Sequence, residues 1–214
     1  MKLVYLKKIN STQLYIKEYI KYNKNTNNIC FYTYLQENGL GSQNNLWEGI
    51  NGNLFFSFVI PINDLPKDLL LQSCSIYFAY ILKEIFRNEG SKVILKWPND
   101  FYINKNKIGG LITNKVGDKL ICGIGINFIK TKSFDGYLDI NINKEELLKK
   151  YFNKLENYPT WKQIFSKYKL EFHSNKLFFT NINNEKISLE QAVLNDDGSL
   201  NINNKKVYSL RWQK

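Results

Sequence analysis

Histidine is nearly absent from this sequence, and that scarcity removes the most common catalytic machinery. The 214 residues contain one histidine, His173, so Ser-His-Asp and Cys-His nucleophilic catalysis lack a plausible base. The three cysteines are widely spaced and form no Cys-x-x-Cys pair, which argues against a structural zinc site. Isolated cysteines (Cys30, Cys74 and Cys122) are typical of reduced, buried thiols, so we expect a cytoplasmic protein.

Long apolar runs are also missing. No segment approaches the roughly 18 apolar residues of a membrane span, and residues 1–8 lack the apolar stretch and small-residue cleavage site of a signal peptide. We therefore expect no contact with a membrane. The 43% hydrophobic and 15% aromatic content favours a folded protein over a disordered one. A chain of 214 residues is long enough for one catalytic core with a small appended domain.

The familiar nucleotide-binding and nucleic-acid-binding motifs are absent as well. There is no Gly-x-x-x-x-Gly-Lys loop, and Gly39-Leu-Gly41 and Gly123-Ile-Gly125 lack the third glycine of a dinucleotide fingerprint, so either pair could be a simple bulge. The net charge of +11 is compatible with nucleic acid, an anionic small molecule or an acidic protein partner. The lysines are scattered through Asn-rich loops without an Arg-rich helix or zinc-finger spacing, which favours solvated lysines over a dedicated partner surface.

What the sequence does contain is a concentration of polar chemistry in one short stretch. Lys96-Trp-Pro-Asn-Asp100 follows an apolar run, and Lys107-Ile-Gly-Gly110 comes seven residues later, after a second strand-like run. Small residues after Lys107 would let a ligand approach the backbone, so Gly110 can present its N–H beside the lysine's charge. The amide and carboxylate that end the first motif offer oxygen ligands for Mg²⁺ together with substrate phosphates. These residues predict a site for a phosphate and its counter-ion, although a solvated hairpin lysine and a capping turn would explain them as well.

Hydrophobic periodicity and turn residues predict an order of helices and strands. Helices are expected at residues 12–22, behind an N-cap at Ser11-Thr12, at 144–157 and at 160–172, with another long helix that starts near Pro66 and ends before Gly90. Strands are expected at 30–35, 53–61, 92–97, 100–104, 107–114, 119–128, 176–181, 186–195, 200–203 and 206–212. The change from mixed to all-β sequence near residue 173 predicts two domains, residues 1–172 and residues 173–214.

Several features in register resemble the biotin–protein ligase family. The matching positions are Ser11-Thr12-Gln13, Gln36, Trp47 and the three central motifs at Lys96–Asp100, Lys107–Ile112 and Gly123–Phe128. The resemblance covers roughly residues 1–130, and the C-terminal part fits more loosely. The Ser-Thr motif begins at residue 11, which leaves no room for the N-terminal winged-helix domain of some members. The monofunctional type, without binding to operator DNA, is therefore expected.

The resemblance implies both a fold and a reaction. The fold is α+β, a class II synthetase-like biotin–lipoate ligase domain whose mixed, largely antiparallel central sheet is flanked by helices, with a small SH3-like β domain at the C-terminus. The reaction activates biotin with MgATP to biotinyl-5′-AMP and then transfers biotin to a lysine of the biotin carrier domain of acetyl-CoA carboxylase. Mg²⁺ is the implied cofactor, and a homodimer is compatible with the resemblance.

The resemblance also assigns roles to particular residues. Ser11 and Thr12, joined by Gln36, would hydrogen-bond the ureido ring of biotin, whereas Lys107 would reach both the biotin carboxylate and the α-phosphate of ATP. The implied biotin-binding residues are Ser11, Thr12, Gln36, Gly39, Gly41, Lys107 and Gly110. The implied ATP- or adenylate-binding residues are Trp47, Lys96, Asn99, Lys107 and Asn127. Trp47 would stack on the adenine or else pack in the core, and Asp100 is the implied Mg²⁺ ligand.

Two other functions are open at this point. A lipoate ligase or octanoyltransferase is similar in fold, although Trp97-Pro98 and Gly125-Ile-Asn127 favour biotin. A non-catalytic nucleic-acid-binding module would use the net charge and the small β domain. One departure from the family lies in the Gly-rich loop, where Leu40 and Ser42 stand in place of arginines that usually face the ligand. We expect Lys107 and backbone N–H groups to carry more of the phosphate stabilisation, and the adenylate to be held less tightly.

Overall fold

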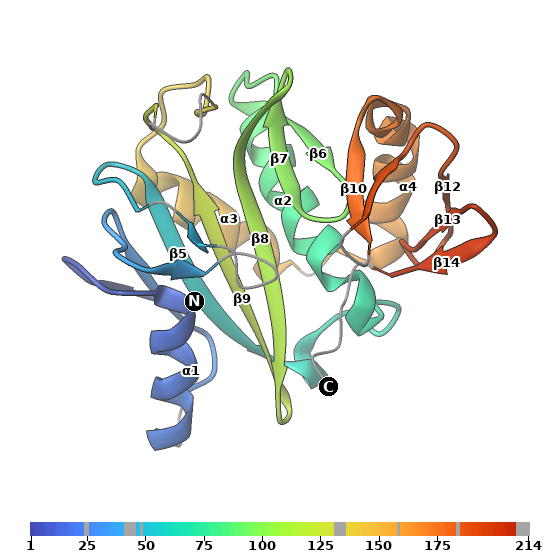
Figure 1. Cartoon of the computed structure of the whole chain (residues 1–214). Coiled ribbons are helices and arrows are strands. Elements are labelled where there is room, and N and C mark those ends of the chain that lie inside the picture. Colours follow the sequence, from blue (N-terminus) through green and yellow to red (C-terminus); the bar gives the residue numbers. More distant parts are fainter. Residues whose placement is uncertain are drawn as a thin grey trace.

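A seven-stranded mixed sheet forms the centre of the molecule (Figure 1). The computed structural model describes residues 1–23, 26–40, 46–47, 49–130, 136–157, 159–182 and 185–208. The strands of this sheet are β1 (Lys2–Tyr5), β2 (Ile29–Thr33), β5 (Leu54–Pro61), β6 (Ile94–Lys96), β7 (Asp100–Ile103), β8 (Asn106–Val116) and β9 (Lys119–Ile126). Their order is β1-β2-β5-β9-β8-β7-β6, and β1 and β2 run parallel whereas the other neighbouring pairs are antiparallel. The expected mixed, largely antiparallel sheet is confirmed.

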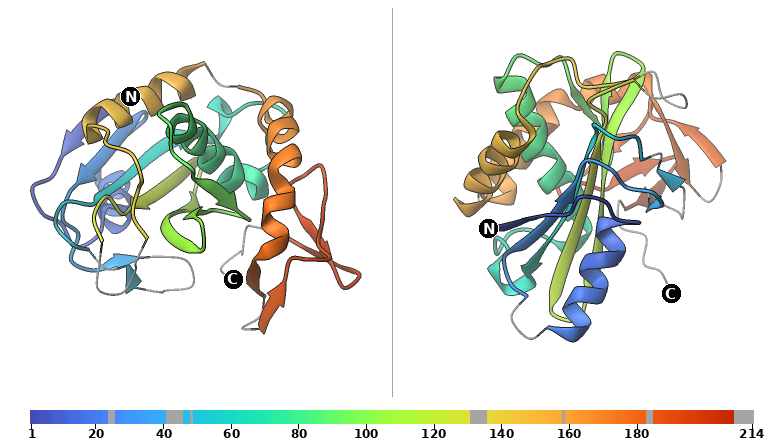
Figure 2. Two further views of the ribbon diagram at one scale, coloured as in Figure 1. Left: turned by 90° about the horizontal axis from the view of Figure 1, so that it is seen from above. Right: turned by 90° about the vertical axis from the view of Figure 1, so that its left-hand side faces the viewer.

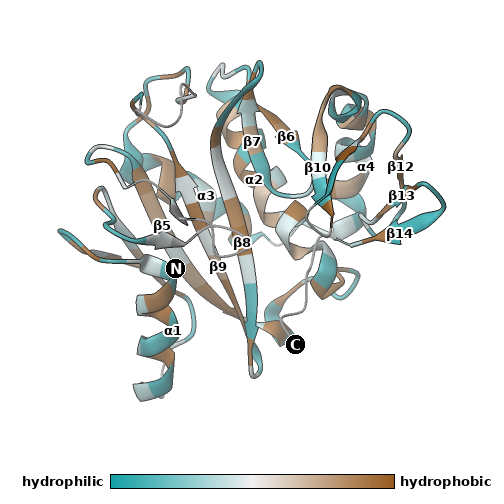
Figure 3. Cartoon of the chain, viewed as in Figure 1, coloured by the Kyte–Doolittle hydropathy of each residue, from teal (hydrophilic) through white to brown (hydrophobic). Residues whose placement is uncertain are grey.

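Helices cover both faces of the sheet. They are α1 (Thr12–Tyr22), α2 (Cys74–Asn88), α3 (Lys144–Glu156) and α4 (Trp161–Glu171). The right-hand view of Figure 2 shows α1 on one side of the sheet and α2 and α3 on the other. Because both sides are covered, β5 is buried from Leu54 to Ile60, and each fully buried large apolar side chain stabilises the fold by roughly 1.5–3 kcal/mol. Figure 3 shows the same pattern, with hydrophobic residues concentrated in the central strands and hydrophilic ones at the turns.

The helix predicted to start near Pro66 starts later in the structure. The regular helix α2 begins at Cys74, and Leu71–Ser73 before it form a single 3-10 turn, η3. The turn that follows Pro66 closes with a bond from Leu69 N–H to the Pro66 carbonyl. Leu70 then adopts an extended conformation (φ −77°, ψ 146°), which interrupts the helix. The helix past that point is confirmed, and it is buried on nearly all sides rather than on one face, since Glu84 alone of the residues from Cys74 to Phe86 is not buried.

Two details at the N-terminus have a clear origin. Ser11 is the N-cap of α1 as predicted, since its Oγ accepts a hydrogen bond from Leu14 N–H at 3.4 Å. Strand β1, which was not predicted, pairs in parallel with β2 through Leu3 opposite Cys30 and Val4 opposite Phe31. Four residues at the edge of a sheet carry too weak an alternation to reveal a strand.

The C-terminal part forms small antiparallel units beside α4. They are β10 (Phe179–Ile182) with β11 (Glu185–Ser188), and β12 (Val193–Leu194) with β13 (Leu200–Ile202) and β14 (Lys205–Val207). The strand expected at 176–181 starts late because Phe172–Leu177 form a 3-10 helix, η4. The strand expected at 186–195 is two strands, since the chain turns at residues 189–192. The end of the one expected at 206–212 lies outside the described residues.

The C-terminal part shares the core of the larger sheet. Leu189 and Leu200 are fully buried and belong to the same hydrophobic cluster as the residues of α2. Asn175, also fully buried, completes the end of β6: its Oδ1 accepts from Trp97 N–H at 2.6 Å and its Nδ2 donates to the Leu95 carbonyl at 3.1 Å. The division at residue 173 stays a prediction, and these contacts tie its two sides together. Among the described helices, none combines the length and apolarity that crossing a membrane requires.

Candidate active site

Strand register brings three predicted site residues, Lys96, Asp100 and Gly110, into one row on the face of the sheet that carries α1. Residues paired across neighbouring strands point to the same face. The pairings of β2, β5, β9, β8, β7 and β6 place these six in one transverse row: Thr33, Phe55, Gly125, Gly110, Asp100 and Lys96. Ser57 and Gly123 lie two residues further along the same face, and Ser57 Oγ donates to Thr12 Oγ1 of α1 at 2.9 Å.

Two glycines form a low floor in the middle of this row. A Cβ at Gly125 would lie 3.3 Å from the Trp47 indole, and one at Gly110 would lie 3.1 Å from Asp100 Oδ1. Gly125 is in regular register with both neighbouring strands, so the Gly-x-Gly of β9 is not a bulge. The floor therefore has an aromatic ring over one glycine and a charged group beside the other.

Asp100 lies between two lysines at one end of the floor. Lys107 Nζ is 2.7 Å from Asp100 Oδ1, and Lys96 Nζ is 3.8 Å from Asp100 Oδ2. Their side chains are 27% and 14% exposed, so this is a half-buried group with one net positive charge. Burial lowers the pKa of Lys96, as do Lys107 and Lys186, whereas Asp100 opposes the shift. Such a centre attracts a multiply charged anion.

The turn that leads into β7 is fastened to β8. The Asn99 carbonyl accepts from Leu111 N–H at 2.9 Å, and Asn99 Nδ2 donates to the Leu111 carbonyl. The same strand carries Lys107 and Gly110, so this double contact fixes Asp100 relative to both. The amide nitrogen of Asn99 is thus engaged by the backbone, and a contact between Asn99 and a phosphate stays a prediction.

The residues present fit a Mg²⁺ ion that arrives with a phosphate ligand. Within the described ranges, no cluster of three or more His, Cys, Asp or Glu side chains is placed to hold a metal. Asp100 supplies one carboxylate next to the anion-attracting lysines. Mg²⁺ is commonly held by one or two carboxylates plus substrate phosphates, so Asp100 would hold it together with the ligand rather than alone.

The start of α1 forms a second, buried polar cluster. Thr12 donates to Gln36 Oε1 through its N–H at 2.9 Å and its Oγ1 at 3.3 Å. Ser11, Thr12 and Gln36 are all 5% exposed or less. A Cβ at Gly39 would lie 2.4 Å from Gln36 Nε2, so glycine leaves room for this amide. The structure therefore brings Ser11, Thr12, Gln36 and Gly39 together, and their role in binding biotin stays a prediction. Gly41 lies outside the described residues.

Trp47 connects the two clusters. It belongs to β4 (Leu46–Trp47), which pairs with β3 (Gly39–Leu40) through Trp47 opposite Gly39. Its ring lies over Gly125, and Lys107 Nζ is 5.3 Å from the ring centroid. Trp47 is half-buried and therefore reaches from the helix-start cluster to the lysine–carboxylate group. Both predicted uses, stacking and packing, are compatible with this position.

Asn127 is less accessible than expected. It is 1% exposed, its Nδ2 donates to the Gly136 carbonyl at 3.3 Å, and its Oδ1 accepts from Asn53 Nδ2 at 3.4 Å. Direct contact with adenine stays a prediction for this residue. Ser57 and Asn53 were missed by sequence reasoning. Ser57 is a single hydroxyl inside the apolar run of β5, and that interruption was a usable signal.

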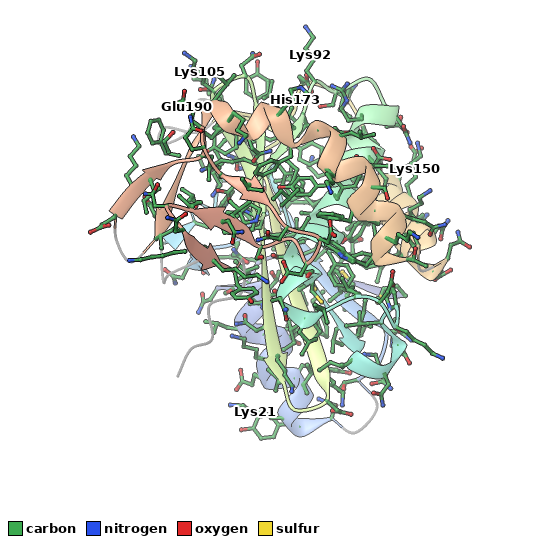
Figure 4. The ribbon with its side chains drawn as sticks, turned by 90° about the vertical axis from the view of Figure 1, so that its right-hand side faces the viewer. Lys21, Lys92, Lys105, Lys150, His173 and Glu190 are labelled. Carbon is green, nitrogen blue, oxygen red and sulfur yellow. The ribbon has the colours of Figure 1, made fainter. Side chains whose placement is uncertain are left out.

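Four lysines outside the site and the single histidine lie on the surface of the molecule. Figure 4 shows Lys21, Lys92, Lys105 and Lys150 at well-separated places on the outside of the molecule, and Lys150 forms ion pairs with Glu89 and Glu146. His173 is exposed at the end of α4, where its Nδ1 lies 3.0 Å from the Leu170 carbonyl oxygen.

The fold and this site define an α+β protein with a half-buried lysine–carboxylate group on the face of its sheet that carries α1. The sequence model of the "Biotin/lipoate A/B protein ligase family" matches residues 5–127. The chain is 29% identical over 141 residues to biotin–protein ligase 2 of Arabidopsis thaliana, an overlap of 58% of this chain and 43% of that protein. It therefore spans less than half of that relative's length.

Solved structures agree with this match. The biotin acetyl coenzyme A carboxylase synthetase of Helicobacter pylori, solved with bound biotinylated ATP, is 35% identical, with a TM-score of 0.93 over 97% of this chain and 99% of that one. The biotin protein ligase of Aquifex aeolicus, in complex with biotin and ATP, shares the fold at 22% identity, with a TM-score of 0.73 over 97% and 94% of the two chains. The chain belongs to the biotin/lipoate A/B protein ligase family.

Proposed function

We propose that this protein is a biotin–protein ligase, which activates biotin with MgATP and transfers it to a lysine of a biotin carrier domain, as in acetyl-CoA carboxylase. One observation carries the proposal: the Lys107–Asp100 pair and the Thr12–Gln36 pair are linked by Trp47 across a glycine floor. A ligand with a neutral polar head and a carboxylate tail matches those two ends. The similarity to the Helicobacter pylori enzyme, which covers nearly the whole of both chains, supports biotin as that ligand.

The helix-start cluster would bind the ureido head. A ureido ring has fixed donors and acceptors, and Ser11, Thr12 and Gln36 offer hydroxyl and amide groups whose positions are set by bonds to one another and to the start of α1. Binding at this end aims the valerate carboxylate along the floor toward Lys107. Fixing both ends of the ligand lowers the entropy cost of bringing the carboxylate to the nucleotide.

The first chemical step would occur beside Lys107. A biotin carboxylate oxygen attacks the α-phosphorus of ATP, the bond to the bridging oxygen breaks, and pyrophosphate leaves with its electron pair. Lys107 balances the negative charge that develops on the α-phosphoryl oxygens, and Lys96 faces the leaving phosphates. Mg²⁺, held by Asp100 and the phosphates, would supply further positive charge there.

The second step consumes the mixed anhydride. A neutral lysine amine of the carrier domain attacks the biotinyl carbonyl carbon, AMP leaves, and the amine loses a proton to form the amide. Trp47 of β4 lies over Gly125 of the floor, where it shields the adenylate from water. We further propose that the reaction takes place in the cytoplasm, where the three free, buried cysteines stay reduced.

Substrate-dependent release of pyrophosphate tests the proposal. The purified chain is incubated with MgATP and biotin, lipoate or octanoate in turn, and transfer to a carrier domain is followed by mass spectrometry. We expect pyrophosphate release with biotin but not with lipoate or octanoate. The carrier domain should gain the mass of one biotinyl group. Release that prefers lipoate or octanoate would move the chain to the lipoate branch of the family. Filter binding to DNA at moderate salt is expected to be negative, and tight binding would favour the nucleic-acid alternative.

A further inference from the structure

Asn53 is a fully buried polar residue that none of the steps above uses. It follows Gly52, whose φ of +104° turns the chain, and it directly precedes β5. The last paired residues of β5 and β9 are Leu54 and Ile126. Beyond that pair the two strands diverge, so the backbone groups that follow need other partners.

The carboxamide of Asn53 supplies those partners. Its Oδ1 accepts from the N–H groups of Phe128 and Ile129, at 2.9 and 3.1 Å. Its Nδ2 donates to Asn127 Oδ1 at 3.4 Å. One side chain therefore fixes three consecutive residues at the end of β9. The Oδ1 bonds hold the backbone, whereas the Nδ2 bond sets which way the Asn127 amide faces.

Asn127 extends this constraint to the strand that carries the lysine. Its carbonyl accepts from Leu138 N–H at 2.8 Å, and its Nδ2 donates to the Gly136 carbonyl at 3.3 Å. Gly136 in turn lies directly against Lys107, because a Cβ at Gly136 would be 2.4 Å from the Lys107 carbonyl oxygen. A continuous series of contacts thus runs from Asn53 through Asn127 and Gly136 to the backbone of Lys107.

We infer that Asn53 is a positioning residue for the nucleotide half of the site, which fixes the orientation of the Asn127 carboxamide and the position of Gly136 beside Lys107. The inference rests on the proposed function and on the contact between Asn127 and the adenine that the family resemblance predicts. A carboxamide that rotates by half a turn exchanges an acceptor for a donor. Holding Asn127 in one orientation therefore keeps one hydrogen-bonding pattern toward the base, and it makes Asn53 a determinant of the preference for ATP over GTP.

Asn53→Asp separates the two kinds of contact. The carboxylate keeps an acceptor for Phe128 and Ile129 N–H, but it places a second oxygen against Asn127 Oδ1. Asn127 then turns its NH₂ toward residue 53 and releases the Gly136 carbonyl. We expect KM for ATP to rise about tenfold, the factor that matches the net contribution of one hydrogen bond, while KM for biotin is unchanged. The ratio of kcat/KM for ATP to that for GTP should fall.

A double-mutant cycle identifies the route of the effect. If Asn53 acts through Asn127, Asn53→Asp should add nothing to the KM for ATP in the Asn127→Ala background. The matched control is Asn153→Asp, the same change on an exposed residue of α3, which should leave both KM values at wild type. Additive effects in the cycle, a wild-type KM for ATP in Asn53→Asp, or equal rises for both substrates would overturn the inference.

Failure of the proposed function has a different signature. If the proposed function is wrong, the wild-type chain releases no pyrophosphate with biotin. The double-mutant cycle is then measured by the rise in Tm that ATP causes in each variant, in place of KM for ATP. Amide hydrogen exchange gives an independent readout: Phe128 and Ile129 should stay protected in Asn53→Asp and exchange faster in Asn53→Ala. Fast exchange in both variants would reduce Asn53 to a structural residue and overturn the positioning role.

Discussion

Replacing Lys107 by alanine separates catalysis from stability. The Lys107–Asp100 pair is 2.7 Å long and only partly buried, and Lys96 remains 3.8 Å from the same carboxylate after the change. Because Asp100 keeps a partner, we expect a loss of about 0–1 kcal/mol in unfolding free energy, the range of partly exposed ion pairs. For a chain of this size that corresponds to a Tm shift of at most about 2–4 °C.

The expected loss of activity is much larger. Removing one preorganised group that stabilises transition-state charge typically costs about 10²–10³ in kcat, or about 2.7–4 kcal/mol. Adenylate formation in Lys107→Ala, measured as biotin-dependent pyrophosphate release, should therefore fall by that factor while the chain stays folded. Lys105→Ala is the matched control, because Lys105 is exposed at the turn between β7 and β8 (Figure 4). Wild-type release in Lys107→Ala, or equal losses in the two variants, would refute the catalytic role of this lysine.

Four further variants test the residues around this lysine–carboxylate group. Burial and the charge of Lys107 lower the pKa of Lys96 below its usual 10.5, so KM for ATP should rise with pH before an exposed lysine would titrate. Lys96→Arg should delay the rise because guanidinium stays protonated, and identical pH profiles would contradict this. Gly109→Ala places a Cβ 2.7 Å from a backbone oxygen and should cost about 1–3 kcal/mol in chemical denaturation, whereas Gly110→Ala presses on the ion pair and should slow adenylation instead. A larger stability loss in Gly110→Ala than in Gly109→Ala would contradict these separate roles of the two glycines. Asn175→Ala leaves two buried backbone groups at the end of β6 without partners and should lower the unfolding free energy by about 2–6 kcal/mol, since each orphaned group costs about 1–3 kcal/mol. An unchanged denaturation midpoint would show that water replaces the amide.

Local signals predicted much of the fold. The cap at Ser11, the helix start at residue 160 and the short strand-like runs each depend on residues that are close together in the sequence. The start of α2 was mispredicted because Pro66 and Leu70 fit a helical pattern that the extended Leu70 breaks. Nothing in the local sequence signals that interruption. Strand β1 was missed for the opposite reason, since its pairing with β2 and not its own pattern makes it a strand.

The site residues, too, were only partly predictable from the sequence. The resemblance identified Ser11, Thr12, Gln36 and Gly39, and the structure brings these four together. It did not reveal the internal supports of the site, Ser57 and Asn53: the hydroxyl of Ser57 interrupts an apolar run and marks a polar position, but its partner Thr12 and the partners of Asn53 are known only from the fold. A buried hydrogen bond is specified by two positions that are distant in the chain, and sequence reasoning sees each of them separately.

By itself the sequence determined the chemical inventory: one histidine, scattered cysteines, and lysines grouped with an amide, a carboxylate and glycines between residues 96 and 110. That inventory restricted the chemistry to anion binding by lysine with a hard metal, and the resemblance directed it to the biotin ligases. Only the tertiary structure decided which residues share a face. Strand register put Lys96, Asp100, Gly110 and Gly125 in one row, because side-chain direction in a sheet depends on pairing with neighbours and a shift of one residue would reverse it.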